Sequence, residues 1–97
     1  MDLQPGTQIA YVPTHANGDL SHPDVEFGFV TSVRGDVAFC RYWSKGDGLR
    51  TTANSEATPI SLLVPHVFKS PRTVADAMKR IEAQWQRTKT AWRECQL

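Results

Sequence analysis

Hydrophobic and polar residues alternate along two consecutive segments, 26–34 and 37–43, which flank Gly35 and Asp36. This alternation has the period of a β-strand, and a two-residue loop that begins with glycine is a common connection in antiparallel hairpins. The sequence therefore predicts a β-hairpin over residues 26–43. The pairs expected across it are Arg34 with Val37, Val33 with Ala38, Thr31 with Cys40, and Phe29 with Tyr42.

Both faces of the predicted hairpin carry large apolar side chains. One face is expected to hold Phe29, Thr31, Val33, Ala38, Cys40 and Tyr42, and the other Val30, Val37, Phe39 and Trp43. Because a sheet with two apolar faces needs a cover on each, we expect a small core beneath one face and another element above the second.

Three more short strands are expected around the hairpin. They are 8–12, 49–53, and a closing strand within 60–68 that Pro65 interrupts, while 14–24 and 54–59 are expected to be loops. Five short strands within roughly 60 residues favour a mainly β fold, namely a small SH3-like antiparallel barrel over residues 1–69.

Residues 70–97 have the pattern of a long amphipathic C-terminal helix. Ser70 or Thr73 can cap its N-terminus, and no glycine or proline follows Thr73. Apolar residues recur at spacings of four and three, which places them on one stripe of a helix. The stripe comprises Val74, Met78, Ile81, Trp85, Thr88, Trp92 and Cys95. It packs on the outer face of the hairpin, pairs with another chain as a short heptad seam in a homodimer, or does both along different turns.

Length and composition limit the classes of protein to which the chain can belong. Its 97 residues suit one domain, with the C-terminal helix either part of it or an extension that binds a partner. No apolar run approaches the ~20 residues that cross a bilayer, and the N-terminus lacks the pattern of a secretory signal. We therefore expect a cytoplasmic protein. Cys40 and Cys95 are expected to be reduced thiols, because two cysteines form no disulfide framework.

Metal-ligand side chains gather in the loop 14–24, where His15, His22 and Asp24 occur together with Asp19. Imidazole and carboxylate groups bind zinc and similar ions. The spacing matches no familiar metal motif, however, and Asn-Gly and His-Pro are typical of an ordinary structured loop. We therefore expect no metal and no other cofactor, and His15, His22 and Asp24 are only the candidate ligands if one binds.

Catalytic side chains show no arrangement that predicts an enzyme. There is no Ser/His/Asp set, phosphate-binding glycine loop or paired-carboxylate motif, and Cys40 alternates onto the expected core face. A metal-dependent enzyme that uses His15 and His22 is the least favoured alternative. The sequence favours a protein without catalytic activity.

Aromatic and basic residues favour a binding function. Aromatic and arginine side chains contribute much of the affinity of protein interfaces. The residues expected to bind a partner are Trp85, Lys89, Trp92 and Arg93 on the helix and Arg41, Tyr42 and Trp43 on the hairpin. Trp85 and Trp92 could instead belong to the core. A nucleic-acid-binding module is the alternative, although a net charge of +1 is low for one.

The segment YVPTHANGDLSHPDVEFGFVTSV, with the later Arg-Tyr-Trp and LRTTANSEATPISLLV, resembles short uncharacterised proteins encoded by tailed phages and prophages of bacteria. In these, a Tyr-x-Pro-x-His-Ala-x-Gly-Asp stretch precedes His-Pro-Asp and Glu-x-Gly-x-Val. The resemblance covers roughly residues 5–64, and the helix from Thr73 onward departs from the shorter members. It implies a phage-type accessory protein and no assigned active site. We expect a non-catalytic protein that binds and modulates or inhibits a host protein, such as a DNA-processing or defence complex.

Overall fold

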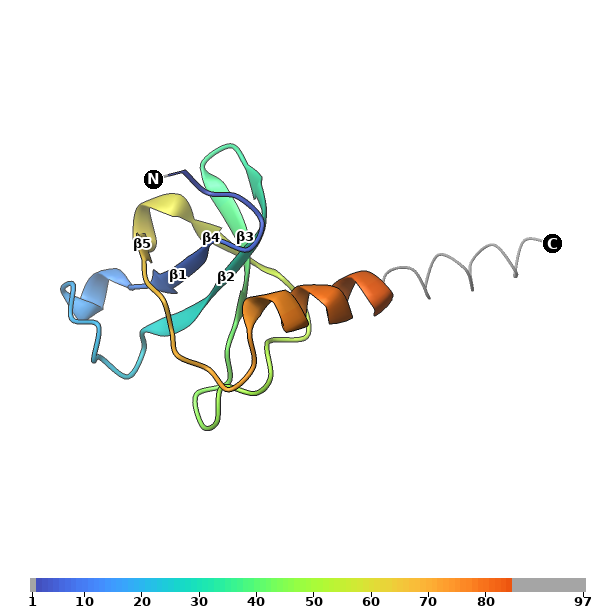
Figure 1. The fold of residues 1–97 in the computed structure, drawn as a ribbon. Coiled ribbons are helices and arrows are strands. Elements are labelled where there is room, and N and C mark those ends of the chain that lie inside the picture. The colour runs from blue at the N-terminus through green and yellow to red at the C-terminus, as the bar shows by residue number, and fades with distance from the viewer. Residues whose placement is uncertain (1, 85–97) are drawn as a thin grey trace.

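The structure is a computed structural model that describes residues 2–84 of the chain. Five strands form one antiparallel sheet in the order β4-β3-β2-β1-β5 (Figure 1). The strands are β1 (Gln8–Tyr11), β2 (Glu26–Arg34), β3 (Val37–Tyr42), β4 (Glu56–Pro59) and β5 (Leu63–Pro65). Two short 3-10 helices, η1 (Thr14–Ala16) and η2 (Ile60–Leu62), connect β1 to the loop before β2 and β4 to β5.

The sheet is open, and this corrects the predicted SH3-like barrel. β4 pairs with β3 and β5 pairs with β1, so these two strands form opposite edges of the sheet and do not pair with each other. The two strands have only four and three residues, so they offer few backbone groups with which to close the sheet. Short edge strands also leave few unpaired backbone groups exposed to another chain.

The predicted hairpin is confirmed at its turn, but the pairing register of its strands differs from the prediction farther from the turn. Arg34 pairs with Val37 as expected, and Gly35 has a positive φ of 62° in the two-residue loop. An irregularity between Val30 and Ser32 then changes the register. Past it, Val30 pairs with Cys40 and Phe29 with Arg41, rather than Thr31 with Cys40 and Phe29 with Tyr42.

Thr31 occupies this irregularity. Its hydroxyl donates to the carbonyl of Phe39 at 2.9 Å and lies 2.7 Å from the hydroxyl of Ser55. Because one residue of a bulge has no partner, the side chains before it exchange faces. Val30 therefore lies on the inner face, where Phe29 was predicted, and Phe29 lies on the outer face.

The fourth strand differs from the prediction. Residues 49–53 form no strand and contribute only an isolated bridge between Thr51 and Trp43. The paired strand is β4, in a segment predicted to be a loop. Of its four residues only Thr58 is buried, and a strand at the edge of a sheet with one buried side chain has little apolar alternation to reveal it.

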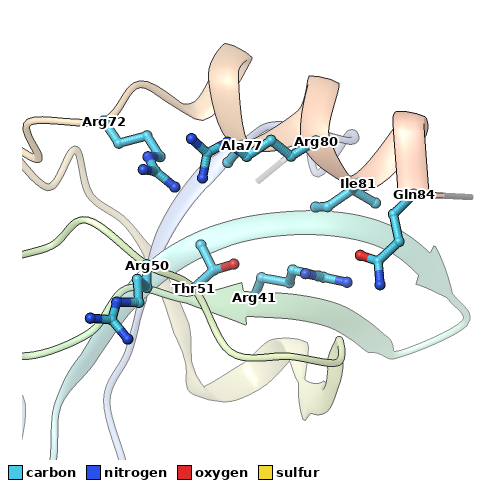
Figure 2. Close-up of a pocket in the computed structure, with 8 residues that line it drawn as sticks. All are labelled: Arg41, Arg50, Thr51, Arg72, Ala77, Arg80, Ile81 and Gln84. Atoms are coloured by element: carbon cyan, nitrogen blue, oxygen red, sulfur yellow. The ribbon is translucent and has the colours of Figure 1, made fainter.

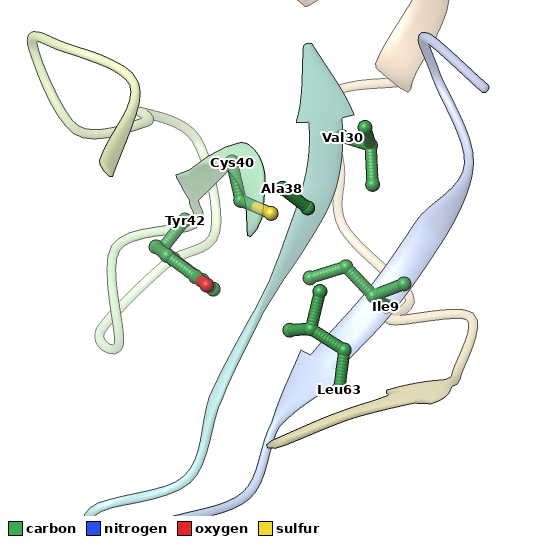
Figure 3. Close-up of a cluster of buried hydrophobic side chains, with 6 residues drawn as sticks. All are labelled: Ile9, Val30, Ala38, Cys40, Tyr42 and Leu63. Atoms are coloured by element: carbon green, nitrogen blue, oxygen red, sulfur yellow. The ribbon is translucent and has the colours of Figure 1, made fainter. Parts of the chain in front are cut away.

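Two apolar clusters cover the two faces of the sheet. The inner cluster consists of Ile9, Val30, Ala38, Cys40, Tyr42 and Leu63, shown in Figure 3. The outer cluster consists of Phe29, Trp43 and Ala77, with Phe68, Val74, Met78 and Ile81 packed against it. The C-terminal helix therefore covers the outer face within the same chain, which is one of the two roles predicted for its stripe.

The described part of this helix spans 74–84 and is 11 residues long, which corrects the long helix predicted over residues 70–97. The hydroxyl of Thr73 accepts the backbone N–H of Asp76 at 3.1 Å and so caps the first turn, whereas the Ser70 hydroxyl bonds to the carbonyl of Gly48. The helix is supported where its stripe packs on the sheet, because tertiary packing supplies most helix stability. The expected homodimer seam depends on residues beyond 84, outside the described range.

Between residues 2 and 84 no helix is both long enough and apolar enough to cross a membrane.

Candidate functional site

Four arginines surround a pocket of about 230 Å³ between the C-terminal helix and the sheet (Figure 2). They come from four separate parts of the chain. The lining residues are Arg41 of β3, Arg50 and Thr51 of the segment between β3 and β4, Arg72 before the helix, and Ala77, Arg80, Ile81 and Gln84 of the helix. No carboxylate is among these lining residues, so the described wall of the pocket is strongly positive.

Arg41 lines the pocket because successive side chains of β3 point to opposite faces of the sheet. Its neighbours Cys40 and Tyr42 are buried in the inner cluster, so the side chain of Arg41 lies on the outer face. The guanidinium donates through Nη1 to the carbonyl of Thr52 at 3.3 Å. Its Nε is buried and has no hydrogen-bond partner among the described residues. An unsatisfied buried donor is costly, typically by about 1–3 kcal/mol, so the described residues satisfy this guanidinium only in part.

Arg72 lies on the segment before the helix and Arg80 on the helix itself, and both line the pocket. In Figure 2 their guanidinium groups point toward each other, whereas those of Arg41 and Arg50 extend toward opposite ends of the pocket. Neither Arg72 nor Arg80 forms an ion pair with a described carboxylate. Two neighbouring cations without a counter-ion repel each other, and an anion between them removes that repulsion.

A tight turn fixes the position of Arg50. The carboxylate of Asp47 accepts the backbone N–H of Leu49 at 2.9 Å and the hydroxyl of Ser44 at 2.8 Å. These two hydrogen bonds, in that order, lower the pKa of Asp47, and the charge of Arg50 makes a smaller contribution. The turn therefore positions the backbone of Arg50, whose carbonyl also accepts the N–H of Ser44 at 2.8 Å, while its exposed side chain forms no ion pair with a described carboxylate.

The three hairpin residues predicted to bind a partner have different environments. Arg41 lines the pocket, but Tyr42 is 2% exposed and Trp43 is 5% exposed. The hydroxyl of Tyr42 bonds to Thr58 at 2.7 Å, and burial above all raises the pKa of Tyr42. Trp43 packs on Phe29 in the outer cluster. Both aromatic side chains therefore support the fold and offer little surface to another molecule.

The four helix residues predicted to bind a partner, Trp85, Lys89, Trp92 and Arg93, lie outside the described residues. The arginine-lined pocket was not among the features predicted from the sequence. A signal was present in the helix: Ala77, Arg80, Ile81 and Gln84 follow the spacing that places residues on one side of a helix. Arg72 and Arg50 had no such signal, because only the tertiary fold brings them to the helix.

The loop between β1 and β2 brings together the candidate metal ligands of the sequence. One potential ligand atom each from His15, His22 and Asp24 lies within 4.8 Å of the others. Asp19 is not part of this group and instead accepts the N–H and hydroxyl of Ser21 at 2.9 and 2.7 Å. These bonds to Ser21 lower the pKa of Asp19, and the hydrogen bond with His15 is the main cause of the lowered pKa of Asp24.

Comparison with known proteins gave no match to a protein-family model, to a curated protein or to a solved structure.

Proposed function

We propose that this protein is a non-catalytic binding protein that recognises an anionic group on a partner protein through the arginine-lined pocket. The observation that carries the proposal is a pocket lined by four arginines, two of which, Arg72 and Arg80, point toward each other, with no carboxylate among its described lining residues. Guanidinium groups bind carboxylates and phosphates through paired hydrogen bonds, and arginine is common at the centres of protein interfaces.

A protein partner is favoured over nucleic acid by how the charge is distributed. The whole chain has a net charge of only +1. A nucleic acid binder requires an extended basic face, because several phosphates are contacted along the backbone. A single pocket of about 230 Å³ fits one anionic side chain or a small group of them better than it fits a strand of phosphates.

The described cysteine supports a role without nucleophilic chemistry. Cys40 is fully buried in the inner cluster, and burial raises the pKa of its thiol. A protonated, inaccessible thiol is a poor nucleophile. Occupation of a partner's surface is a function that needs no reactive group.

The sequence resemblance suggests what kind of protein the partner is. If the chain is a phage-type accessory protein, the partner is a host protein in the cytoplasm, such as a DNA-processing or defence complex. Binding at the arginine-lined pocket would then modulate or block the activity of that protein.

Affinity capture from a host lysate, with and without nuclease, tests the proposal. We expect a stoichiometric protein that survives nuclease treatment and is lost when Arg72 and Arg80 are both changed to alanine. Arg34→Ala is the matched control, because Arg34 is an exposed arginine at the hairpin tip and does not line the pocket. Loss of two charge-assisted hydrogen bonds should weaken binding by a factor of about 100 or more.

Two results would contradict the proposal. The first is capture that disappears with nuclease, combined with an affinity for random oligonucleotides that falls steeply with salt, because both are expected of a nucleic-acid-binding module. The second is a partner whose binding is equally strong with the Arg72→Ala/Arg80→Ala variant and the Arg34→Ala control.

A further inference from the structure

The loop between β1 and β2 places two imidazoles and one carboxylate around one point at the molecular surface. His15 Nε2 lies 2.6 Å from Asp24 Oδ2, and the rings of His15 and His22 lie 5.2 Å apart, inclined by 76°. His22 Nδ1 also accepts the backbone N–H of Asp24 at 3.1 Å. The three side chains come from both ends of the loop and converge only because the chain folds back on itself.

The loop backbone is well anchored beneath these side chains. Ala16 follows His15 and is 3% exposed, and Val25 follows Asp24 and is 4% exposed. Both belong to a third buried cluster together with Ala10 of β1. Each end of the loop therefore has a buried residue directly beside a potential ligand, which fixes the separation of the two ends.

Backbone hydrogen bonds hold the middle of the loop. The N–H of Asp19 donates to the carbonyl of Ala16 at 3.0 Å, that of His22 to Asp19 at 3.1 Å, and that of Val25 to His22 at 3.0 Å. Outside the loop, the Lys45 ammonium donates to the carbonyl of Pro23. A loop with this many internal bonds presents its side chains in a limited range of positions.

From this arrangement we propose that His15, His22 and Asp24 form a binding site for a divalent transition-metal ion, with zinc as the expected metal. Imidazole nitrogens and a carboxylate oxygen are characteristic zinc ligands, whereas calcium and magnesium require mostly oxygen. Ligand atoms around a tetrahedral zinc ion lie about 3.3 Å apart, given bonds of about 2.0–2.2 Å. His15 and Asp24 are exposed and His22 is half-buried, and their ligand atoms already lie within 4.8 Å of one another, so only small side-chain rotations separate them from this spacing.

The ion pair between His15 and Asp24 does not by itself account for the arrangement. The two side chains are 62% and 59% exposed, and an exposed pair of this kind contributes little to stability. A metal ion would replace a weak contact by coordinate bonds that join both ends of the loop. Where His22 binds through Nδ1, the ion takes the place of the Asp24 N–H as the partner of that nitrogen.

Three protein ligands leave at least one coordination position open to solvent. A water molecule or a donor group of a bound molecule can occupy that position. This site lies on a different loop from the arginine-lined pocket and shares no residue with it. The metal proposal therefore does not depend on the proposed function.

Isothermal titration of the full chain with zinc chloride alone tests the site. We expect one zinc ion per chain, and affinity at least 10-fold lower for each of His15→Gln, His22→Gln and Asp24→Asn. The matched control is His66→Gln, because the chain has three histidines and His66 is not among the three grouped ligands; its ring lies 4.7 Å from that of Phe27, tilted by 36°. Circular dichroism and thermal unfolding without metal confirm that each variant is folded.

Cobalt(II) absorption identifies the ligands independently. We expect a visible d–d spectrum without a thiolate-to-cobalt charge-transfer band, and its loss in the three ligand variants. Magnesium at the same concentration should neither bind nor displace cobalt. The site is refuted by the absence of zinc binding, by equal binding to the His66→Gln control and the three ligand variants, or by a thiolate band, which would assign the metal to Cys40 or Cys95.

Discussion

The two faces of the sheet differ in what covers them and in what they leave accessible. The inner face is filled by Ile9, Val30, Leu63 and their neighbours, and this cluster contains no charged side chain. The outer face buries Phe29 and Trp43 beneath the C-terminal helix, and beside that contact lies the arginine-lined pocket. The inner face thus contributes a hydrophobic core to the fold. The outer face combines a structural contact with an accessible charged pocket, so the proposed function depends on the helix remaining in place.

The largest expected effect comes from the inner face. Ile9 is fully buried, and Ile9→Ala should lower the free energy of unfolding by about 2–5 kcal/mol, measured by urea denaturation. Val64→Ala is the control, because Val64 lies on the neighbouring strand but is 36% exposed, and it should change stability by less than about 1 kcal/mol. Equal losses in the two variants would mean that the inner cluster is not the main core.

A substitution where the helix contacts the sheet should disturb the outer face and leave the inner face intact. Ala77 is buried against Phe29 and Trp43, and Ala77→Asp introduces both extra volume and a charge there. We expect a cost of about 1–3 kcal/mol. Hydrogen exchange should show protection lost along 74–84 while the amides of β1 to β3 remain protected, and partner binding should fall.

Ala83→Asp is the matched control for this change. Ala83 lies on the same helix and is exposed, so the substitution should leave the helix protected and partner binding unchanged. If Ala77→Asp unfolds the sheet together with the helix, the two faces form one cooperative unit, and the division drawn between them is wrong.

The helix cap should have a smaller effect confined to the outer face. Thr73→Ala removes the acceptor of the Asp76 N–H and should cost about 1 kcal/mol, whereas Thr73→Ser keeps the hydroxyl and should cost much less. Urea denaturation of the two variants gives the comparison. Equal stability of Thr73→Ala and the wild-type chain would show that Ser70 or another group caps the helix.

The local features of this fold were predictable from the sequence, and the features that depend on distant segments were not. The hairpin turn and the start of the helix near Thr73 follow from neighbouring residues. The bulge at Thr31 depends on Ser55 as well as Phe39, and it reversed the predicted faces of Phe29 and Val30. The pocket could not be predicted because four separate segments contribute its arginines, and packing of the helix brings them together.

An effect similar in size to that of the helix cap is expected near neutral pH for Tyr42 on the inner face. Burial raises the pKa of Tyr42 above its ordinary value of 10.0, so the folded chain keeps the phenolic proton that the unfolded chain loses. The stabilisation is therefore complete below about pH 10 and declines as the pH rises above that value. Tyr42→Phe should lose about 0.5–1.5 kcal/mol at pH 7 and show a flatter decline in stability above pH 10. An unchanged alkaline slope in that variant would mean that Tyr42 is not the titrating group.

The most direct test of the arginine-lined pocket as the binding site is to map the surface that the partner covers. We would titrate the isotopically labelled chain with the captured partner and follow backbone amide and arginine side-chain NMR signals. We predict that the largest changes among residues 2–84 occur at Arg50, Arg72 and Arg80 and at the other helix residues that line the pocket, Ala77, Ile81 and Gln84, with small changes at Arg34 on the hairpin tip. Changes concentrated at the hairpin tip or in the loop 14–24, with the pocket arginines unaffected, would contradict the claim that the arginine-lined pocket is the binding site.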